Sequence, residues 1–249
     1  MKGKLVGRDP RTVAREISGV FEKVFPYLIP GIVANINRLS MPVPGLQLVP
    51  PQLMLESRLQ KAMLFEVAMV VAESRLKGEV FPGWDQMLVR ATNKQRFFYD
   101  ADLPLTLSEP DRKVATMVAE GLVHSLNYYA VLKGVDFGGL KISPKIPGFN
   151  WIASGVGDFS LGDSLIEVKC SGKNFSSADY RQVLMYWILS YLYALETGAE
   201  YWRVCVIINP RLNRMLEIDF DDLLGFMSPW GSKIELLEAF RASIDISPD

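Results

Sequence analysis

The feature that most constrains the fold of this chain is a tight turn followed by a strictly alternating segment. The turn, Leu161–Ser164, contains a glycine and an aspartate, residues that favour the positive φ angles of β-hairpins. The residues after it fall into two sets: Leu165, Glu167 and Lys169, and between them Ile166, Val168 and Cys170. Because successive side chains of a strand point to opposite faces, an acid and a base share one face and the opposite face is apolar.

A second carboxylate precedes this turn. Asp158 stands nine positions before Glu167, so a hairpin folds the two carboxylates toward each other. Neighbouring carboxylates repel unless a cation lies between them, and such oxygen ligands suit Mg²⁺ or Mn²⁺. Lys169 can then contact a metal-bound water or a phosphate. A cation that lowers the pKa of water, beside a positive charge that meets a developing phosphorane, is what metal-assisted phosphodiester hydrolysis requires.

These residues resemble a known group of enzymes. Asp158 followed by Glu167-Val168-Lys169 is similar to the D…(D/E)-x-K core of the PD-(D/E)XK nuclease superfamily, with Gly157 where a proline often stands. Gln182 to Tyr186 resembles the Gln-x-x-x-Tyr motif of its RecB-like exonuclease branch. The resemblance covers roughly residues 109–219. It implies an α/β protein with a restriction-endonuclease-like αβββαβ core.

The resemblance also implies a role for each matching residue. The metal is bound by Asp158, Glu167 and the carbonyl of Val168. The lysine of the triplet positions the attacking water and stabilises charge, and Gln182 positions either that lysine or the substrate. Tyr186 supports the site or stacks on the nucleic acid. Two nearby cations, Arg181 and Lys173, are candidates for phosphate contacts.

The helix before this core is predicted to supply one more metal ligand. It begins with a capping-box pattern at Ser108–Asp111, and it carries Glu120 and the single histidine, His124, four residues apart on one face. RecB-like nucleases often use a histidine of a Gly-x-x-x-His pattern here, and other branches use a glutamate. In Gly121–His124 the spacing is one residue shorter, so the choice between Glu120 and His124 stays open. A structural role for the histidine is a further alternative.

The chain is expected to comprise two parts. Residues 1–105 are predicted to form a mostly helical N-terminal lobe, with one helix starting at Asp9-Pro10 and a long helix over Leu53–Leu76. Residues 106–249 are predicted to form the nuclease-like core with C-terminal helices. The segment Gln95–Tyr99 fits a strand.

Periodicity in the second part predicts the element order helix, three strands, helix, strand. A capped helix from Ser176 is apolar nearly all round between Val183 and Leu195, which indicates burial. The continuous apolar run Tyr201–Asn209 is typical of a central strand, and Met215–Ile218 is expected to pair back on it. A last helix is expected to begin near Ser232.

Composition limits the class of protein. The net charge is −1, whereas phosphate neutralisation usually makes a free-standing DNA binder basic, so a basic surface must be local or a partner must deliver the substrate. The two cysteines have no zinc or iron–sulfur spacing, which favours buried free thiols in a reducing cytosol. The N-terminus has no signal-peptide pattern, and we therefore expect a cytoplasmic protein.

Together these features predict a Mg²⁺- or Mn²⁺-dependent deoxyribonuclease. The Gln-x-x-x-Tyr motif favours an end-dependent exonuclease in DNA repair or defence, with a helicase or other ATPase as partner and no membrane association. Two alternatives stay open at this stage. One is a catalytically weak DNA-binding or scaffold subunit of a helicase–nuclease complex, and the other is a nuclease directed at RNA.

Overall fold

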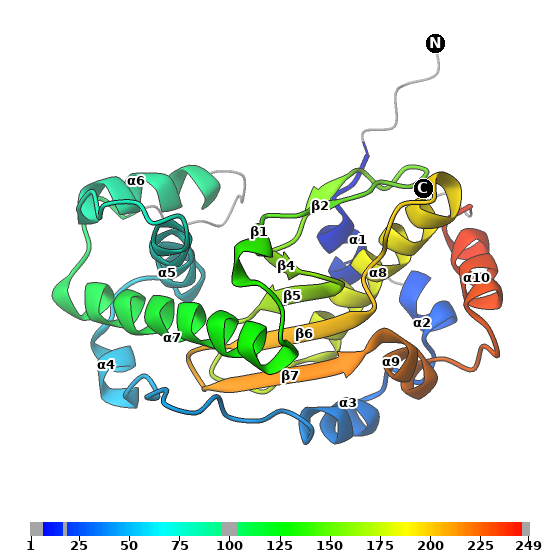
Figure 1. Ribbon diagram of the computed structural model, residues 1–249, viewed down its shortest axis with the longest axis horizontal. Helices are drawn as coiled ribbons and strands as arrows, with labels where there is room; N and C mark the ends of the chain where they lie inside the picture. The colour runs from blue at the N-terminus through cyan, green and yellow to red at the C-terminus, as the bar shows by residue number, and fades with distance from the viewer. Residues whose placement is uncertain (1–6, 17–18, 96–103, 246–249) are drawn as a thin grey trace, which may run out of the picture.

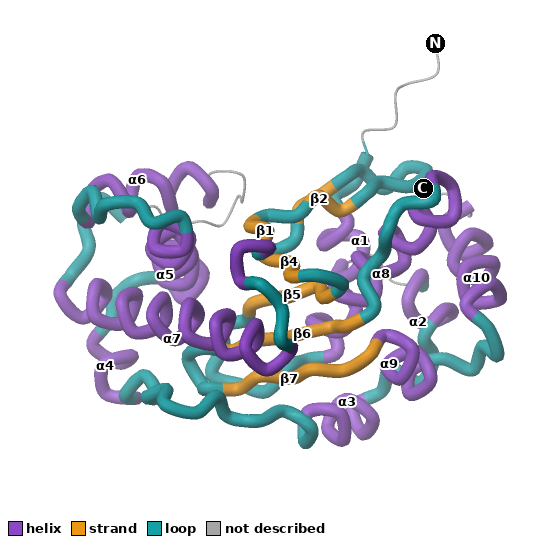
Figure 2. The backbone as a smooth tube through the Cα atoms, in the orientation of Figure 1, coloured by secondary structure: helices purple, strands orange, loops and turns teal. Residues whose placement is uncertain are grey.

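The computed structural model describes residues 7–16, 19–95 and 104–245 of the chain (Figure 1). It is a mixed α/β structure in which an N-terminal helical region precedes a five-stranded mixed sheet flanked by helices (Figure 2). The helices are α1 (Pro10–Glu16), α2 (Val20–Val24), α3 (Pro30–Asn37), α4 (Pro51–Glu56), α5 (Lys61–Leu76), α6 (Trp84–Gln95), α7 (Glu109–Lys133), the 3₁₀ turn η1 (Phe137–Gly139), α8 (Ser177–Thr197), α9 (Phe220–Met227) and α10 (Lys233–Asp245). The strands are β1 (Lys141–Ile142), β2 (Lys145–Ile146), β3 (Gly155–Val156), β4 (Phe159–Leu161), β5 (Ser164–Val168), β6 (Val204–Asn209) and β7 (Arg214–Asp219).

The central sheet has the strand order β1-β4-β5-β6-β7, and β5 and β6 are its parallel neighbours. A parallel pair needs a long crossover connection, which α8 provides. The predicted hairpin is confirmed: β4 and β5 pair antiparallel through a two-residue turn in which Gly162 has φ of 57°. Along the chain, α7 is followed by the central-sheet strands β1, β4 and β5, then by α8 and β6. This is the predicted order of helix, three strands, helix, strand. The small pair β2 and β3 lies outside this sheet as an insertion.

Each face of the sheet contacts a different apolar core. On β5, Ile166 and Val168 join the core with α5, α6 and α7. Leu165 joins the other core, which contains α8 together with α1 to α3, α9 and α10. The helices α7 and α8 therefore cover opposite faces (Figure 1). Because side chains alternate along β5, Glu167 lies on the same face as Leu165, the face that α8 covers.

The first three helices of the chain share an apolar core with residues beyond position 105. The helices α1, α2 and α3 pack within the α8 core, where Val13, Phe21 and Ile36 are buried. The helices α4 and α5 pack on α7 on the other side, and α6 packs on α5 in the same core. The first helices of the chain are therefore part of the structure that surrounds β5 and α8, and they lie beside the residues that the sequence singles out.

The observed helix boundaries agree with some of the sequence predictions and contradict others. The capping boxes at Ser108 and Ser176 are confirmed, with each serine hydroxyl accepting a backbone N–H of the first turn. The single long helix over 53–76 is wrong, because the chain is extended at Ser57 (φ −67°, ψ 129°) and α4 ends there. Its hydroxyl donates to Asp111 Oδ1 at 2.6 Å, an interaction between α4 and α7 that competes with continuation of the helix. Most of the proposed strand at 95–99 lies outside the described residues; Gln95 itself ends α6.

Candidate functional site

Three of the residues singled out by the sequence gather on the α8 face of the sheet. Phe159 is opposite Ile166 in the β4–β5 register, so the next position places Asp158 opposite Glu167. Lys169 follows the last residue of β5, and its backbone N–H donates to the Ile208 carbonyl of β6 at 2.8 Å. The alternation of the strand puts the two carboxylates and the ammonium on one face.

Glu167 is the most deeply buried carboxylate of this group, with 3% of its surface exposed. Its Oε1 accepts hydrogen bonds from Lys169 Nζ at 2.8 Å and from Gln182 Nε2 at 2.7 Å. Its Oε2 is also buried, yet it has no hydrogen-bond partner among the described residues. A buried carboxylate oxygen without a partner is costly, so this atom indicates a place where a cation would be stabilising.

Asp158 is half-buried and is held by the backbone of the neighbouring strand. Its Oδ2 accepts the Val168 N–H at 2.7 Å. Burial, and next the negative charge of Glu167, raise the pKa of Asp158 to about 8, against the opposing effects of Lys169 and of the Val168 N–H. The carboxylate pair therefore resists carrying two negative charges unless a positive charge is added.

Gln182 connects the strand residues with α8. Its Oε1 accepts from Lys169 Nζ at 2.9 Å, and its Nε2 donates to Glu167 Oε1 and to the Tyr186 hydroxyl at 3.1 Å. Gln182 and Tyr186 are four residues apart on a helix, which places them on one face. Burial raises the pKa of the Tyr186 hydroxyl, which stays protonated. The Gln-x-x-x-Tyr pair thus orients Lys169 and one oxygen of Glu167.

Two further residues belong to this network, and the sequence analysis missed both. Arg15 of α1 donates from Nη1 to Gln182 Oε1 at 3.1 Å and forms an ion pair with Asp179 Oδ1 at 3.4 Å. Lys169 Nζ lies 3.6 Å from the same oxygen of Asp179. Asp179 could have been noticed, because it completes the capping box with Ser176. Nothing in the local sequence of α1 indicates that Arg15 reaches a site formed more than 140 residues later.

Glu120 and His124 do not join the carboxylate pair. They lie on α7, which packs on the opposite face of the sheet from α8. Glu120 accepts a hydrogen bond from Arg75 at 3.0 Å, and His124 Nε2 donates to the Pro44 carbonyl at 2.8 Å. In the described part of the chain, no group of three or more His, Cys, Asp or Glu residues is placed to hold a metal. The structure therefore does not support an additional ligand from this helix.

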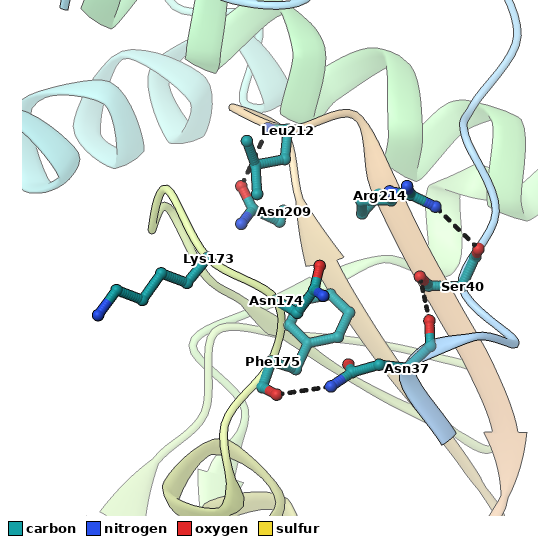
Figure 3. Close-up of a pocket in the computed structure, with 8 residues that line it drawn as sticks. All are labelled: Asn37, Ser40, Lys173, Asn174, Phe175, Asn209, Leu212 and Arg214. Carbon is teal, nitrogen blue, oxygen red and sulfur yellow. Dashed lines mark hydrogen bonds between the residues drawn. The ribbon is translucent and has the colours of Figure 1, made fainter. Parts of the chain in front are cut away.

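The two predicted phosphate contacts have different surroundings. Arg181 forms an ion pair with Glu22 of α2 at 3.1 Å, so its charge is already partly neutralised. Lys173 is exposed on the loop between β5 and α8, beside a shallow hollow next to β6 and β7. Figure 3 shows its side chain extending away from the other residues that line this hollow. Of the two, Lys173 is the one that remains available to a ligand.

The remaining sequence predictions concern thiols and membranes. Both cysteines are free thiols; Cys205 is buried, but Cys170 is only half-buried. Burial raises the pKa of the Cys170 thiol to about 12. Within residues 7–16, 19–95 and 104–245, no helix combines the length and the apolar character needed to cross a bilayer. A role for the Val168 carbonyl as a metal ligand stays a prediction.

Comparison of the chain with protein-family models, with curated proteins and with solved structures finds no match. The functional conclusion therefore rests on the residues themselves. Glu167, Lys169, Gln182 and Tyr186 are connected by side-chain hydrogen bonds between β5 and α8. Asp158 is held beside them by the Val168 N–H.

Proposed function

We propose that this protein is a divalent-metal-dependent nuclease with a restriction-endonuclease-like core. The observation that carries the proposal is the buried Oε2 of Glu167, which lacks a partner among the described residues and lies beside the half-buried carboxylate of Asp158. The order α7, three sheet strands, α8 and β6 supports the αβββαβ assignment. The Lys169–Gln182–Tyr186 network supports the RecB-like branch.

The donor set fits a hard divalent cation. Asp158 and Glu167 would hold Mg²⁺ or Mn²⁺ through carboxylate oxygens, the ligand type that these ions prefer. When bound, the ion would lower the pKa of a coordinated water and offset charge on the phosphate. The cation would also remove the repulsion that raises the pKa of Asp158.

The residues around the carboxylates have separate tasks in this proposal. Lys169 holds its ammonium at the edge of the acid pair, where it can orient a water and stabilise negative charge on a phosphate oxygen. Gln182 fixes that ammonium through its carbonyl oxygen and fixes Glu167 through its amide N–H groups. The Lys169 ammonium sets the orientation of the amide, because a flipped amide would place its NH₂ against the ammonium, and the Tyr186 hydroxyl accepts a hydrogen bond from the amide nitrogen.

DNA is the proposed substrate, and cleavage from an end is the proposed mode. Both follow from the Gln-x-x-x-Tyr resemblance, as do a helicase or other ATPase partner and a cytoplasmic role in DNA repair or defence; these are analogies at the level of the fold. A net charge of −1 favours a partner that delivers the strand.

A scaffold function is the second candidate, and one observation favours it. Among the described residues, the two carboxylates do not form with a third His, Cys, Asp or Glu a group placed to hold a metal, so metal affinity depends on few protein ligands. A scaffold subunit with this fold would bind DNA in a complex without cleaving it. Titration with Mn²⁺ separates the two candidates, because a scaffold requires no ion at Asp158 and Glu167.

The test is a nuclease assay with Mg²⁺ or Mn²⁺ on supercoiled, linear double-stranded and single-stranded DNA. Lys169→Ala is expected to reduce the rate at least about 100-fold, since it removes the ammonium that pairs with Glu167. Lys113→Ala is the matched control, because that lysine is exposed on α7 and pairs with Glu109. Degradation of linear DNA with survival of circles supports exonuclease action. Intact DNA in every form with wild-type protein would refute the proposal.

A further inference from the structure

The charges around the acid pair pose a problem for an anionic substrate. Three carboxylates, those of Asp158, Glu167 and Asp179, surround the single ammonium of Lys169. Considered alone, β5 and α8 therefore give this site a surplus of negative charge. A nucleic-acid strand brings a further negative charge with each phosphate, so it needs more positive charge than these two elements provide.

Helix α1 supplies positive charge at this position. Arg15 lies against α8, where its Nη1 bonds to Gln182 Oε1 and pairs with Asp179, while 30% of its side chain is exposed. Both contacts use the same nitrogen. The guanidinium has five N–H donors in a planar fork, which leaves donors on its exposed side for phosphate oxygens.

Arg11 stands one helical turn before Arg15 in α1. The start of α1 lies beside β3, where a Cβ atom at Gly155, three residues before Asp158, would contact Pro10 and Asp9. Arg11 is exposed, and its charge acts on Asp158. Residues four apart share one face of a helix, so Arg11 and Arg15 extend from the same face of α1.

We propose that Arg11 and Arg15 of α1 form a phosphate-binding pair that holds the nucleic-acid backbone against the acid pair. This inference rests on the proposed nuclease function and adds a substrate contact from outside the αβββαβ core. Arg15 has a second task as a positioning residue, because the atom of Gln182 that it contacts also accepts from Lys169. Arg11 and Arg15 add two positive charges to that of Lys169, and a bound divalent ion would add two more.

The experiment measures binding of a short fluorescein-labelled single-stranded DNA by anisotropy, with Ca²⁺ present and salt varied from about 50 to 200 mM. Arg15→Ala and Arg11→Ala are each expected to weaken binding roughly 5- to 20-fold at the lowest salt. Each is also expected to lower the slope of log affinity against log salt by about one, since each removes one phosphate contact. Arg15→Lys should show the wild-type slope of log affinity against log salt, because lysine keeps the positive charge.

Arg75→Ala is the matched control, because Arg75 also forms an exposed ion pair with a carboxylate but lies on the α7 side of the sheet. Its affinity and slope should equal those of the wild type. A purely structural Arg15 would lower the melting temperature and leave the slope unchanged, which would overturn the inference. Arg11 is exposed, so its variant keeps the test valid if Arg15→Ala does not fold.

The binding result is separable from the nuclease proposal. If wild-type protein shows the arginine-dependent slope but cleaves no DNA with Mn²⁺, the nuclease proposal fails and the phosphate contact stands. Wild-type protein that does not bind the oligonucleotide, or binds it with a slope that neither arginine affects, refutes the contact by α1.

Discussion

Replacing Asp158 by asparagine should stabilise the metal-free protein at neutral pH. The substitution keeps the shape of the side chain, and its carbonyl oxygen can still accept the Val168 N–H that Oδ2 accepts at 2.7 Å. What it removes is an ionisable carboxyl beside Glu167, whose own Oε2 lacks a partner among the described residues. The variant therefore isolates the cost of burying that carboxyl next to a second one.

The sign and size of the effect follow from proton linkage. The pKa of Asp158 is raised to about 8, and an unfolded aspartate has a pKa of about 3.9. Between these values the folded state holds the extra proton, so stability falls as pH rises, by up to about 1.4 kcal/mol per pH unit. From pH 5 to pH 7 the free energy of unfolding of the wild type can therefore fall by at most about 2.7 kcal/mol. Because solvent screens this half-buried group, we expect a loss of about 1–2 kcal/mol between these two pH values.

The assay is thermal unfolding in EDTA at pH 5 and pH 7. Because about 1 kcal/mol shifts the melting temperature of a protein of this size by about 2–4 °C, the difference between Asp158→Asn and wild type should grow by roughly 3–6 °C at the higher pH. Asp163→Asn, in the exposed hairpin turn, is the matched control and should show no such change. A variant that is less stable than wild type at pH 7 would refute the reasoning.

Adding Mn²⁺ should stabilise the wild type more than Asp158→Asn, the opposite of the order expected in EDTA. Mn²⁺ at about 100 times its dissociation constant adds about 2.7 kcal/mol to the stability of a protein that binds it only when folded. Wild type should gain this stability at pH 7, and Asp158→Asn should gain much less because it has lost a charged ligand. Equal stabilisation of both proteins would place the ion elsewhere.

Three further variants test the surrounding structure. Gln182→Ala should lower the free energy of unfolding in urea by about 1–3 kcal/mol and lower kcat at least about 10-fold. The reason is that buried polar groups of Glu167 and Lys169 lose a partner, and unchanged stability would contradict this network. Glu120→Ala and His124→Ala should leave Mn²⁺ affinity and cleavage within about twofold of wild type. Ser176→Ala should lower stability by about 1 kcal/mol, measured by thermal unfolding, since it removes the N-cap of α8.

Local sequence patterns predicted the central part of the site well, for physical reasons. Alternation along β5 fixes which side chains share a face, and the Gly162 turn fixes the register that sets Asp158 opposite Glu167. The four-residue spacing of Gln182 and Tyr186 fixes their common face of α8. Each of these relations is set by residues close together in the chain.

Relations set by tertiary packing were not predictable in this way. Whether α7 presents Glu120 and His124 to the site depends on which face of the sheet α7 covers, and its own periodicity carries no such information. The break between α4 and α5 depends on the bond from Ser57 to Asp111, whose partners are 54 residues apart. Arg15 reaches Gln182 across an even longer separation.

The network also bears on whether the site is catalytic or only structural. A structural ion pair between Glu167 and Lys169 would be most stable with every polar atom satisfied, because an unsatisfied buried oxygen destabilises the fold. Here Lys169 and Arg15 both donate to Gln182 Oε1, while the Oε2 of Glu167 has no partner among the described residues and lies beside a carboxyl that resists ionisation. A buried carboxylate oxygen without a donor, next to a second carboxyl, favours a ligand that is itself a cation. The scaffold alternative offers no reason to retain that destabilising arrangement.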